Sequence, residues 1–240
     1  MSITRREALA TLAVATAAGT ALGAEKGEKK EAKPAAEIGK HQPKPLPFDP
    51  KKLKGISEKM ILSHHDNNYT GAVKSLNKVE EELSHLTKDS PPFLWGGLKE
   101  RELTFTNSMV LHELYFGNLG GEGKPAGAIE KALGAAHGSF GKWEEQFRAT
   151  GASLGGGSGW VVLDYGLLDG ELHTYWSGGH AQTAALGAPL LVMDMYEHAY
   201  QLDHGAGFAK YIDAFFQSLN WEEVDRRYER AQKASALLRG

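Results

Sequence analysis

The apolar residues of 57–86 recur largely every three or four positions, which is the period of a helix that buries one face. A polar break with two prolines follows at 89–92, and a second helical pattern runs from about 99 to 116 until glycines end it. Two long helices joined by a short break predict an antiparallel helical hairpin. Shorter helical patterns follow at 126–133 and 141–149.

The pattern changes after a glycine-rich stretch. Strand-like runs at 160–163 and 172–176 flank a short turn, which predicts a β-hairpin, and a third apolar run at 190–193 predicts another strand. Helical patterns at 206–219 and 221–238 close the chain. Helices followed by a small antiparallel sheet with flanking helices make the predicted fold class α+β.

Residues 1–24 have the features of an export signal. Arg5 and Arg6 precede an alanine-rich apolar run, and small residues follow that run. The paired arginines predict the twin-arginine route, with the mature protein in the periplasm or cell envelope. A helical tail that stays in the cytoplasm is the alternative.

The rest of the chain divides by composition into three parts. Residues 25–44 are rich in lysine and contain prolines, so we expect a solvated tether. The helical hairpin domain is expected at 45–122 and a C-terminal α/β domain at 123–240.

Composition excludes several classes of function. Lysine and arginine number 27 against 30 aspartates and glutamates, a formal charge of −3, so the chain is not a polycation for binding nucleic acid. No apolar stretch reaches the roughly 18 residues of a membrane span, so we expect none in the mature protein. Cysteine is absent, which excludes disulfides, thiol nucleophiles and thiolate metal sites. A tightly bound metal must therefore use His, Asp or Glu.

Histidines and one acid stand where metal ligands are expected. Asp194 and His198 are four residues apart directly after an apolar run, and this spacing lets two side chains of a helix share one ion. His112 lies among apolar residues of the second helix, where a satisfied core histidine is the alternative. The pair His64 and His65 lies in the first helix, with exposed polar residues as the alternative. Three imidazoles and one carboxylate suit Mn, Fe or Zn, but spacing alone leaves open whether they meet.

Five sequence boxes occur in one order along the chain. They are LSHHDNNYTGAVKSLN (62–77), the helix around His112 with Tyr115 and Phe116, the turn Gly157-Ser158-Gly159-Trp160, the segment 194–200, and YIDAFFQSLNWEEVDRRY (211–228). The Asp-x-x-Glu-His-Ala-Tyr box and the Asn-Trp pair in the last box are the most specific. Together the five boxes resemble the iron/manganese superoxide dismutases over about residues 45–235.

This resemblance implies a helical hairpin and a C-terminal domain with a three-stranded antiparallel sheet. One Fe or Mn ion per chain is expected between the two domains, with His64, His112, Asp194 and His198 as its ligands. The implied reaction converts superoxide to dioxygen and hydrogen peroxide as the ion alternates between its 2+ and 3+ states.

The sequence departs from the family at the substrate funnel. Asn68 and Ala72 stand where the family has a histidine and a tyrosine, and Tyr69 is displaced by about 100° around an α-helix from Asn68. Gln201 replaces the tyrosine that bonds the funnel histidine across a dimer, and Asn68 and Gln201 are able to bond each other instead. Glu197 resembles the residue that reaches the partner's ligand histidine. We therefore expect a homodimer through Glu197, Asn68 and Gln201.

The aromatic surroundings of the implied site are also altered. Trp160 is kept, whereas Phe116, Val162 and Tyr196 stand where the family commonly has tryptophan. His180 is the candidate for the group that orients metal-bound solvent, a role that an amide usually fills. A loop histidine without such a role is the alternative.

Three functions follow from these residues. The first is an exported superoxide dismutase with His180, Asn68, Tyr69, Trp160 and Glu197 around the metal. The second is a metal-binding protein of the same fold without dismutase turnover. The third is a metal hydrolase or oxygenase, in which Glu197 is the one obvious general base.

Overall fold

The computed structural model describes residues 38–240. The expected export signal at 1–24 and most of the tether at 25–44 lie outside these residues. The end of the tether runs along the first long helical stretch, where the Gly39 N–H donates to Glu80 and the His41 N–H donates to Asn77. The described residues belong to one compact unit. The boundary expected after residue 122, between a helical hairpin domain and a C-terminal domain, stays a prediction.

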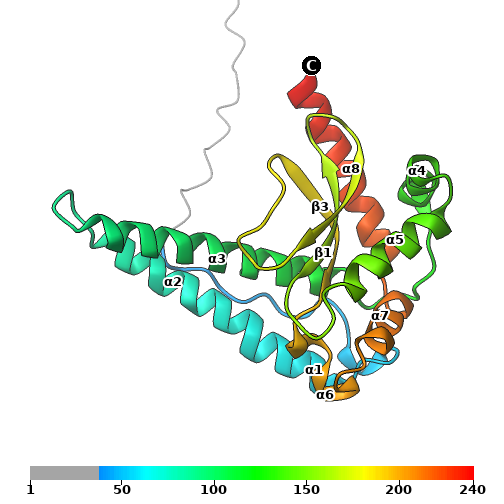
Figure 1. The fold of residues 1–240 in the computed structure, drawn as a ribbon, viewed down its shortest axis with the longest axis horizontal. Coiled ribbons are helices and arrows are strands. Elements are labelled where there is room, and N and C mark those ends of the chain that lie inside the picture. Colours follow the sequence, from blue (N-terminus) through cyan, green and yellow to red (C-terminus); the bar gives the residue numbers. More distant parts are fainter. Residues whose placement is uncertain (1–37) are drawn as a thin grey trace, which may run out of the picture. The chain divides into compact units, whose positions relative to one another are not determined.

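The predicted helical hairpin is present. The first long stretch consists of α1 (Glu58–Ser63), a π-helical segment (His64–Tyr69) and α2 (Thr70–Ser84). It lies side by side with α3 (Pro92–Gly117), as Figure 1 shows. Helix α3 begins earlier than the apolar pattern predicts, because proline suits the first turn of a helix.

The predicted sheet is also present. Strands β1 (Trp160–Gly166), β2 (Leu172–Ser177) and β3 (Gly187–Asp194) form a three-stranded antiparallel sheet in the order β2-β1-β3. Strand β1 is buried along almost its whole length because it is the central strand. The third strand ends at Asp194, so the sheet delivers this carboxylate to the edge that faces the hairpin helix α3.

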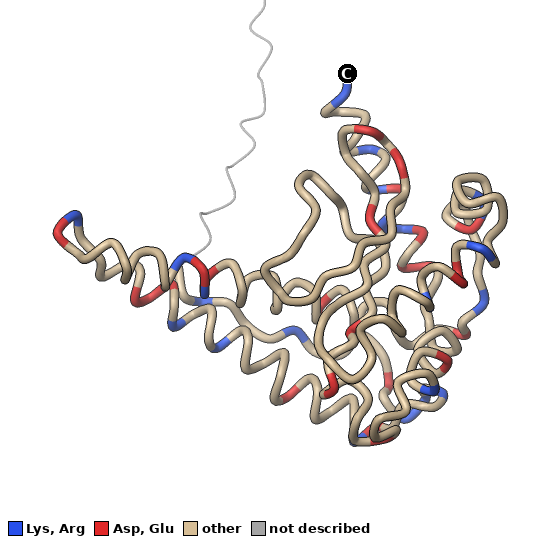
Figure 2. The backbone as a smooth tube through the Cα atoms, in the orientation of Figure 1, with Lys and Arg blue, Asp and Glu red and all other residues tan. Residues whose placement is uncertain are grey.

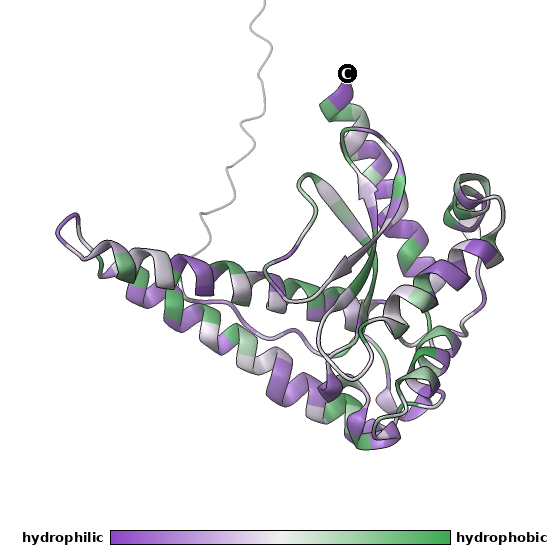
Figure 3. Cartoon of the chain, in the orientation of Figure 1, coloured by the Kyte–Doolittle hydropathy of each residue, from purple (hydrophilic) through white to green (hydrophobic). Residues whose placement is uncertain are grey.

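Five helices complete the C-terminal part of the chain. They are α4 (Gly127–His137), α5 (Phe140–Ala152), α6 (Gln201–His204), α7 (Phe208–Gln217) and α8 (Trp221–Arg239). Helix α5 packs on β1 and β2, whereas α3 and α8 pack on β3 (Figure 1). Apolar residues gather where these helices meet the sheet (Figure 3), which places the core between them. The α+β fold class is therefore confirmed, and the short helix α6 is an addition to the predicted elements.

Asn118, buried at the end of α3, joins three elements near the end of β3. Its side-chain amide donates to the Val192 carbonyl at 2.6 Å and accepts from the Arg227 guanidinium at 2.6 Å. Its carbonyl accepts from the Asn220 N–H, at the start of α8, at 2.6 Å. These bonds fix α3, β3 and α8 relative to one another, and α3 and β3 carry candidate ligands.

Charged residues of both signs are interspersed along the helices (Figure 2). Within residues 38–240, no helix has the length and apolar character that crossing a membrane requires.

Asp164 is a buried carboxylate of β1 at the point where the β1–β3 register shifts. It is 3% exposed, and its Oδ1 has no hydrogen-bond partner among the described residues. Burial raises the pKa of Asp164 to about 6, against smaller lowering effects of the Ala188 N–H and of His173. Between about pH 4 and about pH 6 the folded chain keeps a proton that the unfolded chain loses, so this group makes stability fall as pH rises through that range.

We therefore expect Asp164→Asn to raise the free energy of unfolding by about 1–3 kcal/mol at a pH near 8. The gain should largely vanish at about pH 3, below both pKa values, where the wild-type carboxyl is protonated in both states. Thermal unfolding of metal-free protein at both pH values checks this. Asp213→Asn is the control, since Asp213 is an exposed partner of Arg148. Equal stability of the Asp164 variant and wild type at both pH values would contradict the raised pKa.

Candidate metal centre

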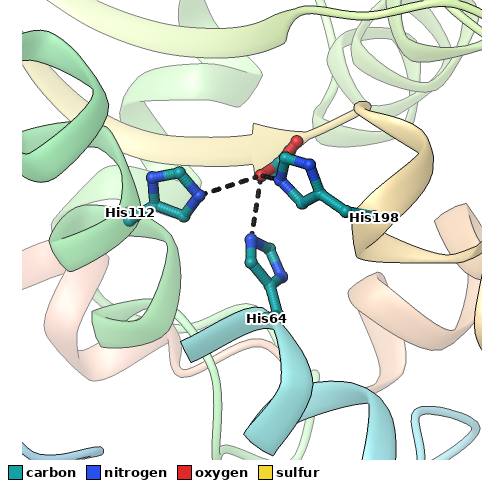
Figure 4. A group of neighbouring side chains, drawn as sticks. His64, His112 and His198 are labelled. Atoms are coloured by element: carbon teal, nitrogen blue, oxygen red, sulfur yellow. Dashed lines mark hydrogen bonds and ion pairs between the residues drawn. The ribbon is translucent and has the colours of Figure 1, made fainter. Parts of the chain in front are cut away.

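Four side chains from separate parts of the chain meet between the hairpin and the sheet. His64 lies in the π-helical segment, His112 in α3, Asp194 at the end of β3, and His198 in the following 3-10 turn. One nitrogen or oxygen of each lies within 4.8 Å of the others. Figure 4 shows the three imidazoles directed at one carboxylate. The structure thus brings together the four residues that the family resemblance implied as ligands.

The two carboxylate oxygens of Asp194 have different neighbours: one contacts the backbone and the other contacts the histidines. Its Oδ1 accepts from the Tyr196 N–H at 2.8 Å, which fixes the plane of the carboxylate. Its Oδ2 lies 3.1 Å from the Nε2 atoms of His64 and His198 and 3.7 Å from that of His112. One oxygen and three nitrogens are therefore left facing a common point.

The donor set fits a cation at this point. The His112 Nδ1 is 2.6 Å from the Ser108 carbonyl, which only accepts, so this nitrogen carries the ring proton. The Nε2 of neutral His112 therefore holds a lone pair, and it is buried without a hydrogen-bond partner in the described chain. This lone pair faces a carboxylate oxygen that also only accepts. A metal ion between them satisfies both groups.

The charge states of these residues also suit metal binding. Burial alone would raise the pKa of Asp194, but His198 and His64 beside it lower that pKa overall. Burial lowers the pKa of His64 and brings that of His112 to about 3. Burial would also lower the pKa of His198, but the neighbouring Asp194 raises it overall. At neutral pH the site therefore offers an ionised carboxylate and at least two neutral imidazoles, the forms that bind metals.

Aromatic rings enclose the side of the site toward the sheet. Trp160 lies edge-on to His112 at 5.1 Å between ring centroids, and its indole N–H donates to His180 Nδ1 at 3.0 Å. Tyr196 stacks between His180 and His198, at 4.9 and 5.3 Å. The structure thus places Trp160 and His180 beside the four convergent residues.

The sequence analysis assigned no role at the site to two buried tyrosines that also contact the candidate ligands. Tyr115 and Phe116 each lie 5.1 Å from the His64 ring, between centroids. The Tyr211 hydroxyl donates to the Asp194 carbonyl at 2.7 Å and lies 3.3 Å from the Tyr115 hydroxyl. The position of Tyr115, three residues after His112 and so on the same helix face, was the available signal.

The remaining predicted residues do not belong to the group of four convergent side chains. Asn68 is half-buried, and Glu197 and Gln201 are exposed in the single chain. Tyr69 is buried, but its hydroxyl donates to Glu113 at 3.0 Å. The α-helical step assumed between Asn68 and Tyr69 does not apply, because the segment is π-helical.

This α+β fold brings three imidazoles and one carboxylate together at one buried point. The arrangement is that of a metalloprotein with one metal ion per site. The model of the iron/manganese superoxide dismutase C-terminal domain matches residues 125–227. An iron superoxide dismutase of Cupriavidus metallidurans is 47% identical over 192 residues, which cover 80% of this chain and 98% of that protein. The chain belongs to the iron/manganese superoxide dismutase family.

More distant relatives carry either metal. An iron superoxide dismutase of Aquifex aeolicus is 33% identical over 211 residues, covering 84% of this chain and 97% of the relative. A manganese superoxide dismutase of Haloferax volcanii is 32% identical over 192 residues, covering 78% of this chain and 94% of the relative. The buried His and Asp group together with these relatives identifies the cofactor as one Fe or Mn ion.

Proposed function

We propose that this chain is a superoxide dismutase, an oxidoreductase whose single Fe or Mn ion is held by His64, His112, Asp194 and His198. The observation that carries the proposal is the buried, unpaired Nε2 of His112 facing the Asp194 carboxylate. When bound, the ion supplies one-electron exchange between its 2+ and 3+ states, which yields dioxygen in one half-reaction and hydrogen peroxide in the other.

The chain's own residues control what reaches the site. The side chain of His198 is 25% exposed, whereas those of His64 and Asp194 are fully buried. In the single chain the group of four residues is therefore open to solvent at His198 and closed at His64 and Asp194. The aromatic rings behind the ligands exclude water, which strengthens the attraction between charges inside the site.

His180 is the residue we assign to hold a proton for the second half-reaction. Its Nδ1 accepts from Trp160, so in the neutral ring the proton lies on Nε2. Burial lowers the pKa of His180, which keeps the ring neutral near pH 7. Trp160 and the stacked Tyr196 then act as positioning residues for this N–H donor.

Elemental analysis of the purified protein together with a dismutase assay tests the function. We expect about one Fe or Mn per chain and inhibition of superoxide-driven cytochrome c reduction. Metal without inhibition would favour the second candidate, a metal-binding protein without turnover, for which the altered funnel at Asn68 and Ala72 argues. Family membership argues against the hydrolase or oxygenase reading with Glu197 as base.

We also propose a homodimer through Glu197, Asn68 and Gln201. Glu197 is exposed and directly precedes His198 in the chain. The side chains of Asn68 and Gln201 have no hydrogen-bond partner within the described residues. A second copy supplies partners for all three residues across a twofold axis. The Asn68 and Gln201 amides then bond each other, each from a different protomer.

A double-mutant cycle on the dimer tests this contact. Asn68→Ala and Gln201→Ala are each expected to weaken dimerisation by about 25-fold, the value of two hydrogen bonds, because a twofold axis repeats the contact. The double variant should weaken it by no more than either single variant. Sedimentation equilibrium measures the dissociation constants. Asn67→Ala is the control, since that amide bonds the Ser63 carbonyl of its own helix. A monomeric wild type, or additive effects, would contradict the contact.

Export to the periplasm or cell envelope is a further proposal, supported by Arg5-Arg6 and the alanine-rich run that follows. Amino-terminal sequencing of the protein from its own cells tests it. A mature chain that starts near residue 25 supports export, and an intact start contradicts it.

A further inference from the structure

The π-helical segment turns Tyr69 to the same side as the candidate ligand His64. In an α-helix, residues five apart are separated by about 140° around the axis, at 3.6 residues per turn. In a π-helix the hydrogen bonds join residues i and i+5, so residues five apart lie one above the other. His64 and Tyr69 are the first and last residues of the π-helical segment and are therefore five residues apart. Both are almost fully buried.

The Tyr69 side chain connects this segment to α3. Its hydroxyl donates to Glu113 Oε1 at 3.0 Å and accepts from the Lys44 N–H at 2.8 Å. Glu113 directly follows the candidate ligand His112, and the rings of Tyr69 and His112 lie 6.3 Å apart between centroids. One partly buried hydrogen bond therefore links the two helical segments that carry His64 and His112.

Two further contacts close this link. The Lys44 ammonium pairs with Glu113 Oε2, and His65 Nε2 donates to the Lys44 carbonyl at 2.8 Å. A cavity of about 380 Å³ lies beside these contacts, and its lining includes Lys44, His65, Tyr69, Glu113 and the apolar ring of Phe116. An open cavity beside the two segments leaves them less constrained by packing there, so the hydrogen bonds bear more of the positioning.

We propose that Tyr69 and Glu113 are positioning residues that set the separation of the His64 and His112 imidazoles and thereby slow the release of the metal. The inference rests on the proposed function, because it requires that both histidines bind the ion. Neither residue touches the ion or the substrate in this proposal. Their effect passes through the backbone of the π-helical segment and of α3.

The test measures metal release from the full-length holoprotein loaded with Fe, after transfer into excess EDTA. Tyr69→Phe and Glu113→Ala are each expected to speed release by about 10-fold, the range seen when groups that orient metal ligands are removed. The double variant should release Fe no faster than the faster single variant, since both remove the same bond. Glu113→Gln keeps an acceptor for the Tyr69 hydroxyl and should restore release to about 3-fold of wild type or less.

A matched control separates positioning from general loss of stability. Ser235→Ala removes a partly buried hydroxyl hydrogen bond, from α8 to the Leu167 carbonyl at 2.8 Å, away from the metal site. It should lower the melting temperature by no more than Tyr69→Phe, which loses two hydroxyl hydrogen bonds, and leave Fe release unchanged. The EPR spectrum of the Fe(III) form reports ligand geometry, and it should change in Tyr69→Phe and Glu113→Ala only.

The outcomes distinguish this inference from the proposed function. A wild-type protein that holds neither Fe nor Mn would overturn the proposed function itself. Wild-type protein that holds Fe, with Tyr69→Phe and Glu113→Ala releasing it at the wild-type rate and with the wild-type EPR spectrum, would overturn the positioning role alone. Faster release in Ser235→Ala as well would also overturn it, because stability would then explain the effect.

Discussion

Replacing Asp194 by alanine should remove most of the bound metal and with it the dismutase activity. Asp194 is the one anion among the four convergent residues and is fully buried. Two unit charges about 4 Å apart at a protein site attract by about 4 kcal/mol, which corresponds to about 1000-fold in metal affinity. Elemental analysis after dialysis should therefore find little Fe or Mn in the variant.

Two comparisons make the Asp194 result specific. Asp213→Ala removes an exposed carboxylate and should keep full metal content. Asp194→Asn keeps an oxygen for the Tyr196 N–H but loses the charge, and it should also lose metal. Full metal content combined with lost turnover in the alanine variant would place Asp194 outside the ligand set.

Replacing His180 by alanine should give the opposite combination, with metal retained and turnover lowered by about 100-fold. Removal of one fixed hydrogen-bond donor from an active site has effects of about this size. His180 is held by Trp160 through its ring and by Asn107, whose amide donates to the His180 carbonyl at 2.7 Å. These two bonds fix the donor beside His112 without making it a candidate ligand.

His180→Gln keeps an N–H donor and should recover part of the lost rate. His173→Ala is the matched control, because that histidine lies on β2 and pairs with Asp169. Pulse radiolysis measures the rate and elemental analysis the metal content. An unchanged rate would support the alternative of a loop histidine, and lost metal would show a structural role instead.

Most of the fold was accessible to pattern reasoning because it depends on local periodicity. The break at Pro91-Pro92 separates two helical patterns, and the structure has two helical stretches there. The π-helical segment His64–Tyr69 was not accessible, because its sequence differs little from that of an ordinary helical turn. The resulting change in direction of Tyr69 was therefore missed, and so was its bond to Glu113.

The sequence predicted which four residues are the candidate ligands, but it did not predict that their side chains lie close together. Their residue types and the Asp-x-x-Glu-His-Ala-Tyr box suggested them through the family resemblance. Their convergence depends on the packing of α3 against β3, which Asn118 and Arg227 fix. Tyr211 was not singled out, because a tyrosine within an apolar helix has no feature that marks a bond to the Asp194 backbone.

The sequence by itself determined the order of helices and strands and, through the absence of cysteine, the restriction of metal ligands to His, Asp and Glu. These properties follow from residue type and from contacts within a few positions of the chain. Only the tertiary structure decided that residues as distant as His64 and His198 share one buried point. Such convergence requires helices and sheet to pack in three dimensions, and the period of one segment carries no information about which other segment will lie beside it.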